Sequence, residues 1–156
     1  MRLNCLSESR SFTLYKGISI ASGYQNYLSG QSVVPGFLST KYIAWIYSQP
    51  ALTGEDTDPS LIVSFDIDGS EVEDRTQAFL EWCEDTGKEP DISLGFPPEW
   101  RNGAVWTVNT DSSGHSGVDC YEGADFVFCG VQKPFRVVEH FANEEAWEAA
   151  SQKYRR

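Results

Sequence analysis

The chain has 156 residues and a formal net charge of −11, and 40 % of its residues are apolar. This length fits one folded domain with a core of its own, and we expect a single domain over residues 1–156. The acidic charge argues against direct binding of nucleic acid or of an anionic membrane, because phosphate groups repel such a surface. It leaves three explanations open: solubility, a protein partner with a basic surface, or mimicry of nucleic-acid charge.

The cysteines and the apolar runs indicate the cellular compartment in which the protein is expected. The four cysteines, at positions 5, 83, 120 and 129, form no C-x-x-C pair, so no zinc ribbon or thioredoxin motif is predicted. The start of the chain lacks a signal-peptide pattern, and no apolar run approaches the ~20 residues of a membrane span. We therefore expect a cytoplasmic protein with reduced thiols; an effector delivered into a host cytoplasm would have the same features.

Turn and capping residues divide the first 50 residues. Gly17 is expected to end a first strand, Thr40 to cap a helix at its start, and Pro50 to stop that helix. The expected elements are a strand over 11–16, a short helix and then a loop over 18–32, a strand over 37–39 and a helix over 41–48.

The clearest strand of the chain comes next. Residues 61–67 are β-branched and almost continuously apolar, which is typical of a strand buried on both faces. A polar loop over 51–60 precedes it. After it, Ser70 and Glu73 stand at capping-box spacing and predict a helix that Gly87 ends. Residues 86–103 hold three prolines and predict a long irregular insertion.

The last third of the chain alternates strands with a second long loop. Strands are expected over 104–108, 125–129 and 135–140, and the loop covers 109–124. Asn143 predicts the start of a final helix whose residues Trp147, Ala150 and Tyr154 lie one above another. About five or six strands with three or so helices indicate a mixed α+β domain.

Two familiar kinds of catalytic site are not predicted. The chain has only two histidines, His115 and His140, so a three-histidine metal site is excluded. A Ser-His-Asp set can be drawn from Ser113, His115 and Asp111 or Asp119, but all of them share one loop with nothing to orient them. We therefore predict no metal and no such triad.

Three segments form a pattern when they are taken together. They are Leu14-Tyr15-Lys16-Gly17-Ile18-Ser19; Gly36-Phe37-Leu38-Ser39-Thr40-Lys41 with Ala44 and Tyr47 after it; and Asp125-Phe126-Val127-Phe128 followed by Pro134-Phe135-Arg136-Val137-Val138. In this order, from about residue 12 to residue 140, they resemble the ADP-ribosyltransferase superfamily. Its members carry a strand ending in Tyr-Arg-Gly or His-Gly-Thr/Ser, a strand reading Phe-x-Ser-Thr-Ser before a helix, and a late strand that opens with an acid and precedes a Phe-x-Val strand.

The resemblance implies an α+β fold in which two small packed β-sheets with flanking helices form an NAD cleft. It implies a mono-ADP-ribosyltransferase, a glycosyltransferase that cleaves NAD at the nicotinamide–ribose bond and transfers ADP-ribose to a protein target. NAD is the substrate, and no metal is required. Small proteins of this bacterial or phage type suggest a toxin or effector that acts on a host or defence protein.

The resemblance also assigns roles to residues. The Gly17 backbone would approach the nicotinamide amide, Lys16 would pair with the pyrophosphate or the adenosine ribose, and Ser39 would brace the catalytic acid. Asp125 would stabilise the positive charge that builds on the ribose, and residues 109–124 would recognise the target. Tyr15, Phe37 or Tyr47 would pack on the nicotinamide ring. The implied catalytic residues are Lys16, Ser39 and Asp125, and the implied NAD-binding residues are Tyr15, Lys16, Gly17, Ser39, Thr40 and Tyr47.

Several positions depart from the family pattern and leave alternatives open. Lys16 stands where the family has Arg or His, Lys41 replaces the last Ser of the Ser-Thr-Ser pattern, and Asp125 replaces the usual Glu. Asp119 or Glu122 is an alternative acid. The alternative functions are an NAD glycohydrolase and an acidic inhibitor that blocks a nucleic-acid-handling complex. Each position also has a plain structural alternative: a strand-end lysine, a turn glycine, a helix cap, a loop-end acid or a core aromatic ring.

Overall fold

The structure is a computed structural model that describes residues 11–109 and 126–155. Within these ranges the chain forms several small sheets and short helices, which confirms the predicted α+β class. The chain divides into two compact units, each built from three segments. The first unit contains 34–38 and 67–132 with the first twelve residues, and the second contains 13–33, 39–66 and 133–156. Each unit is described by itself.

The second unit is built on a three-stranded sheet in the order β1-β4-β9. β4 and β9 are antiparallel, with a register shift between Ile62 and Val63. Residues 60–65 of β4 are fully buried, as the apolar run predicts. The elements are β1 (Ser11–Ile18), η1 (Ile20–Ser22), α2 (Tyr24–Ser29), β2 (Ser32–Val33), α3 (Lys41–Tyr47), α4 (Pro50–Thr53), β4 (Ser60–Asp68), β8 (Lys133–Pro134), β9 (Arg136–Phe141), α6 (Glu144–Ala149) and α7 (Ser151–Tyr154).

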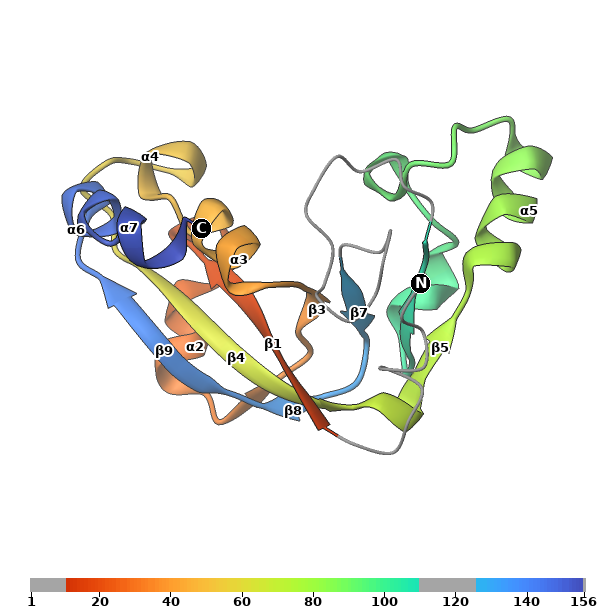
Figure 1. The fold of residues 1–156 in the computed structure, drawn as a ribbon, viewed down its shortest axis with the longest axis horizontal. Coiled ribbons are helices and arrows are strands. Elements are labelled where there is room, and N and C mark those ends of the chain that lie inside the picture. Colours follow the sequence, from red (N-terminus) through yellow and green to blue (C-terminus); the bar gives the residue numbers. More distant parts are fainter. Residues whose placement is uncertain (1–10, 110–125, 156) are drawn as a thin grey trace. The chain divides into compact units, whose positions relative to one another are not determined.

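Helices cover this sheet, and α3, α4, α6 and α7 gather on one side of it (Figure 1). The core there contains Trp45 and Trp147, whose rings stack at 4.1 Å between centroids. Each indole N–H donates to the backbone oxygen of the other tryptophan, at 3.2 and 2.7 Å. α2 packs against the same sheet through Tyr24, whose hydroxyl lies 2.6 Å from Nε2 of His140 on β9.

The first unit is built on a four-stranded sheet in the order β3-β7-β6-β5. Its pairs are antiparallel except β5 with β6, which is parallel. Its core is almost entirely aromatic, with Phe79, Phe96, Trp106, Phe126 and Phe128 buried together. The elements are β3 (Gly36–Leu38), η2 (Gly69–Glu71), β5 (Val72–Asp74), α5 (Thr76–Thr86), η3 (Ile92–Leu94), η4 (Pro98–Arg101), β6 (Val105–Thr107) and β7 (Val127–Cys129).

The predicted capping box at Ser70 and Glu73 is wrong. Asp68 accepts from the backbone N of Ser70 at 2.9 Å and forms a single short turn, after which residues 72–74 pair with β6 as a strand. The helix starts only at Thr76, and Asp74 accepts from its backbone N and hydroxyl at 2.9 and 2.6 Å. A long-range strand pairing therefore overrides the local capping signal. Gly87 ends the helix in the left-handed conformation, as predicted.

Three other boundaries differ from those predicted. β1 continues through Gly17 to Ile18, because this glycine adopts no turn conformation. Pro50 opens α4 as its first residue rather than leading into a loop. The final helix, capped by Asn143 as predicted, breaks at Ala150 into α6 and α7, although Trp147 and Tyr154 are buried as expected.

Candidate functional site

The first predicted motif lies on β1, and strand alternation separates its side chains. Leu14 and Ile18 are buried, and Lys16 lies between them on the same face of the strand. Tyr15 and Gly17 lie on the opposite face, toward α3. Burial lowers the pKa of Lys16 below its ordinary value. The motif therefore presents a partly desolvated cation on one face and a glycine on the other.

The second predicted motif meets the first through a single bridge. The backbone N of Tyr15 donates to the oxygen of Ser39 at 2.8 Å, and the backbone N of Ser39 donates to the oxygen of Tyr15 at 2.9 Å. Just before Ser39, β3 pairs with β7 instead. This bridge pairs the backbones of two segments more than twenty residues apart in sequence, and Ser39 is buried there.

The helix that follows Ser39 is fixed at both ends. Thr40 caps α3, since its hydroxyl accepts from the backbone N of Ile43 at 3.3 Å, as predicted. Near the other end, a Cβ on Gly17 would lie 2.1 Å from the oxygen of Ala44 and 2.7 Å from the N of Ser48. β1 therefore approaches the helix backbone so closely that only glycine fits.

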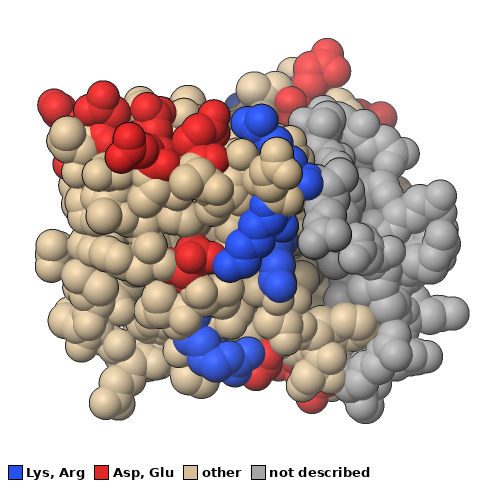
Figure 2. All heavy atoms as spheres, turned by 60° about the vertical axis from the view of Figure 1, so that its left-hand side comes forward, with Lys and Arg blue, Asp and Glu red and all other residues tan. Residues whose placement is uncertain are grey.

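Aromatic rings and cations gather around Tyr15. Its ring packs against the Trp45 core cluster, with the Nζ of Lys41 lying 5.4 Å from the ring centroid. The guanidinium of Arg155 lies 5.0 Å from the Trp45 ring. Figure 2 shows Lys and Arg side chains in a band near the middle of one face, with an acidic group against the band and a larger group of acidic side chains at the upper left. Tyr15 is therefore a core-edge residue with a cation over its ring.

The other proposed aromatic walls differ in setting. Tyr47 is 47 % exposed at the end of α3, so its ring is accessible to a ligand. Phe37 packs edge-on against Phe96, Phe126 and Phe128 in the first unit, with centroid distances of 4.9–5.9 Å. Phe37 is also 37 % exposed, so its ring lies at the edge of this aromatic core.

The predicted acid falls outside the description. Asp125, its alternatives Asp119 and Glu122, and nearly all of the predicted recognition loop at 109–124 lie outside the described residues. The same is true of Asp111, Ser113 and His115. The site that the structure brings together therefore consists of Tyr15, Gly17, Ser39, Thr40 and Tyr47, with Lys16 on the reverse face of β1.

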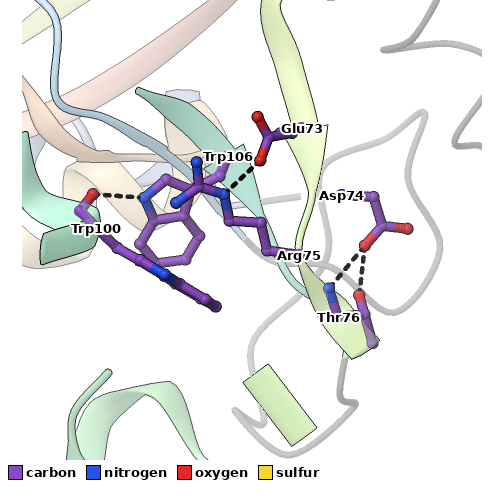
Figure 3. A network of polar contacts seen from close by, with 6 residues as sticks. All are labelled: Glu73, Asp74, Arg75, Thr76, Trp100 and Trp106. Atoms are coloured by element: carbon purple, nitrogen blue, oxygen red, sulfur yellow. Dashed lines mark hydrogen bonds and ion pairs between the residues drawn. The ribbon is translucent and has the colours of Figure 1, made fainter. Parts of the chain in front are cut away.

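A groove in the first unit was not predicted. It has a volume of about 500 Å³, and Arg75, Glu99, Trp100 and Asn102 are among the residues that line it. Arg75 donates from Nε to Glu73 at 2.7 Å, and its guanidinium lies 5.1 Å from the Trp100 ring centroid (Figure 3). Sequence patterns offered no signal for it, because the capping-box interpretation placed Glu73 and Arg75 on a helix.

A second groove, of about 690 Å³, lies in the second unit. Its lining includes four carboxylates, from Asp56, Glu144, Glu145 and Glu148. The side chain of Gln49 donates to Glu144 at 2.9 Å, and the backbone N of Glu144 donates to the oxygen of Asp56 at 2.8 Å. This groove concentrates part of the chain's negative charge in one place.

Comparison with known proteins adds no assignment: no family model matches the chain, and no curated protein or solved structure matches it significantly. Over residues 11–109 and 126–155, no cluster of three His, Cys, Asp or Glu side chains has the geometry to hold a metal ion. None of the helices in the same ranges has the length and apolar character that crossing a membrane requires.

Proposed function

We propose that this protein is a mono-ADP-ribosyltransferase that cleaves NAD at the nicotinamide–ribose bond and transfers ADP-ribose to a protein target. The observation that supports this most is the Tyr15–Ser39 bridge, with its two hydrogen bonds of 2.8 and 2.9 Å. It brings together two short motifs that resemble one family and that are separated in the sequence. The proposal extends to an ADP-ribosyltransferase-like NAD cleft, one wall of which would be β1, Ser39 and α3.

The backbone of Gly17 suits a carboxamide. In a strand, the N–H and C=O of residues i and i+2 point toward the same edge, so those of Gly17 point to the edge where Tyr15 meets Ser39. The pairing there is limited to this one bridge among the described residues, and does not extend to Gly17. The nicotinamide carboxamide carries one donor group and one acceptor and would complete this edge.

Neighbouring side chains have matching roles in the proposal. Tyr47, whose backbone lies close to Gly17, offers an exposed ring for the nicotinamide. Lys16 is a cation whose charge is partly desolvated, which strengthens its attraction to a pyrophosphate. Ser39 provides a buried hydroxyl at the junction, which is the point where Tyr15 of β1 pairs with Ser39, and Thr40 caps the start of α3.

The chemistry needs a carboxylate beside the ribose. As the bond from the ribose anomeric carbon to the nicotinamide nitrogen breaks, its electrons leave with nicotinamide, and the ribose becomes oxocarbenium-like. A fixed carboxylate stabilises that charge, and we assign this role to Asp125. The nucleophile of the target then bonds to the anomeric carbon and releases its proton. We place this reaction in the cytoplasm, including a host cytoplasm if the protein is an effector.

The test combines binding and transfer. We expect NAD to raise the melting temperature of the full chain in a dose-dependent way, since a ligand of the native state stabilises it. With labelled NAD, we expect a labelled protein in a host lysate, and loss of the label with Asp125→Ala. Asp85→Ala, an exposed acid on α5, is the matched control and should keep full transfer. No melting shift at millimolar NAD would refute the proposal, and unchanged transfer by Asp125→Ala would refute the choice of acid.

The second groove, which is lined by four carboxylates and is called the acidic groove below, favours a second candidate function. Its four carboxylates, together with the net charge of −11, suit a protein partner with a basic surface. In this alternative the chain is an acidic inhibitor of a nucleic-acid-handling complex. Its binding would fall steeply with salt and would not depend on NAD. An NAD glycohydrolase would instead release free nicotinamide without any acceptor protein.

A further inference from the structure

The groove in the first unit contains an arginine whose hydrogen-bonding capacity is only partly used. The Arg75 side chain is 18 % exposed, and its Nε donates to Glu73 at 2.7 Å. Neither terminal nitrogen of its guanidinium has an acceptor among the residues that the structure describes. Arg75 is therefore a largely buried fork with two terminal amino groups still able to donate, and such a fork suits a ligand with two adjacent acceptors.

The surroundings hold this fork in place. Its guanidinium lies 5.1 Å from the centroid of the Trp100 ring, and Glu73 fixes the Nε end (Figure 3). Trp100 is itself fixed, because its backbone oxygen accepts from the indole N–H of the fully buried Trp106 at 2.8 Å. The donors are thus positioned before any ligand arrives, which lowers the entropy cost of binding.

The charge of the groove limits the ligand. Three carboxylates, from Glu73, Asp74 and Glu99, line it beside the single guanidinium of Arg75. A phosphate or a carboxylate ligand would be repelled by this excess, and a cation would meet Arg75. The groove therefore favours an uncharged ligand that accepts hydrogen bonds on one edge and donates them on another.

The remaining polar groups define those edges. The carboxylate of Asp74 already accepts two hydrogen bonds from Thr76. The side chains of Glu99 and Asn102 form no hydrogen bond with other described residues. Glu99 offers only acceptors, Asn102 offers both kinds of group, and Trp100 adds aromatic surface. The ligand should thus be flat, with an acceptor pair for Arg75 and N–H donors for Glu99.

We propose that this groove binds a guanine base. Guanine carries two adjacent acceptors, O6 and N7, which match an arginine fork, and its N1–H and N2–H groups donate from the neighbouring edge. Adenine presents the N6 amino donor beside N7, so one donor of Arg75 would face another donor. None of the residues that line this groove is among those proposed to bind NAD or to act on it.

The experiment titrates the full chain with nucleosides by calorimetry. Guanosine is expected to bind, and adenosine to bind at least about tenfold more weakly, because bidentate pairing discriminates between bases by about that factor or more. Inosine, which lacks the N2 amino group, should fall between them. Guanosine monophosphate should bind more weakly than guanosine, because the three carboxylates repel its phosphate. Equal binding of guanosine and adenosine, or no binding of guanosine at millimolar concentration, would overturn the proposal.

Two variants test the residues. Arg75→Lys keeps the charge but loses the fork and should weaken guanosine binding about tenfold or more. Glu99→Gln replaces one acceptor by a donor at constant size and should also weaken it. Arg101→Lys is the matched control, because this exposed arginine lies over the Phe96 ring in the same unit and should not change binding. If Arg75→Lys does not fold, Glu99→Gln decides, and unchanged binding in Glu99→Gln would then overturn the proposal.

Two further measurements distinguish a free nucleoside from a base within a strand, and the guanine proposal from the NAD proposal. A short single-stranded oligoguanosine is compared with guanosine: stronger binding of the nucleoside identifies a free ligand, and stronger binding of the oligonucleotide identifies a base within a strand. Either result supports recognition of guanine. The melting shift caused by NAD should be the same in Arg75→Lys and in the unaltered chain, so failure of one proposal is distinguishable from failure of the other.

Discussion

At the scale of single residues, Gly17 shows how packing and a proposed function coincide. Its missing side chain lets β1 approach the backbone of α3, where a Cβ would lie 2.1 Å from the oxygen of Ala44. The same close approach carries the backbone of Gly17 to the end of α3, next to Tyr47. A substitution here therefore changes the fold of the junction before it changes any contact with a ligand.

Gly17→Ala should lower the free energy of unfolding by about 3 kcal/mol, because the methyl group overlaps backbone atoms that cannot rotate away. The measurement is urea unfolding followed by fluorescence. Gly87→Ala is the matched control: it has a φ of +70° but open space around its Cβ, so only the backbone strain of about 1 kcal/mol applies. A smaller effect at Gly17 than at Gly87 would contradict the close packing of β1 on α3.

Glu139 gives a prediction with a defined pH dependence. Burial raises the pKa of its carboxyl, but hydrogen bonds from Lys153 at 2.6 Å and Tyr154 at 2.7 Å, with the attraction of Lys153, outweigh burial and leave the pKa lowered. A lowered pKa in the folded state means that the carboxylate stabilises the fold above its unfolded pKa of about 4.3. This stabilisation is lost as the pH falls through the folded pKa.

Glu139→Gln should therefore lower the free energy of unfolding by about 1–2 kcal/mol at pH 7, since hydrogen bonds to a charged group contribute about that much. The difference from the unaltered chain should shrink as the pH falls below the unfolded pKa of about 4.3, and it should vanish once the pH lies below the folded pKa. Urea unfolding at several pH values measures it. Glu145→Gln, an exposed position on α6, is the control; a Glu139 difference that grows toward low pH would show that the sign is wrong.

At the scale of elements, two tryptophans join the C-terminal helices to α3. Each indole donates to the backbone oxygen of the other residue, and the rings are parallel within 3°. Neither bond belongs to a helix ladder, so both bonds join α3 to α6 directly. The Trp45 ring of this pair also contacts Tyr154, with ring centroids 6.3 Å apart, and the guanidinium of Arg155 at 5.0 Å.

Trp147→Phe should lower the free energy of unfolding by about 2–4 kcal/mol, because it leaves a cavity and removes the indole bond to the backbone oxygen of Trp45, which keeps only its bonds from Ser48. Trp82→Phe, a half-buried position on α5, should cost much less. Chemical unfolding of both variants compares them. If the two variants were equally stable, the reciprocal bonds would not be what holds α6 and α7 in place.

Elements that depend on local signals were predicted well. The buried run of β4 and the caps at Thr40, Gly87 and Asn143 appear as the sequence indicates, because each rests on residues within one turn or strand. The strand β5 was missed because its partner, β6, lies about thirty residues further along the chain. Non-local pairing of this kind leaves no trace in local spacing.

The candidate site likewise has features that the sequence predicted and features that depend on non-local contacts. The resemblance identified the segments around Tyr15 and Ser39, and the structure joins them, but the reason for a glycine at position 17 was packing that no motif predicts. The fork of Arg75 was missed because it depends on Trp100, twenty-five residues away, and on a strand that was read as a helix. Groups of side chains from separate elements come together only in the folded chain, so local sequence patterns do not predict them.

At the scale of the whole molecule, each compact unit is assembled from three separate stretches of chain, so neither can be obtained by cutting the chain once. β4 itself runs from Ser60, in the second unit, to Asp68, in the first. Unfolding of either unit therefore frees the ends of segments that the other unit needs. The net charge of −11 belongs to the whole chain, and repulsion among the excess carboxylates opposes folding of the molecule.

Raising the salt concentration from about 10 mM to about 150 mM should raise the melting temperature by several degrees, because the screening length falls from about 30 Å to about 8 Å and the repulsion among excess carboxylates weakens. Acidic side chains gather on one part of the surface in Figure 2, and Glu148 is an exposed member of the acidic groove. Glu148→Lys should raise the melting temperature at low salt and reduce the response to salt, while Glu148→Gln should give about half of each effect. Differential scanning calorimetry at constant pH measures all three. A melting temperature that falls with added salt would mean that attractive ion pairs, such as Arg136 with Asp66 at 3.0 Å, outweigh the repulsion, and the charge would then stabilise rather than oppose the fold.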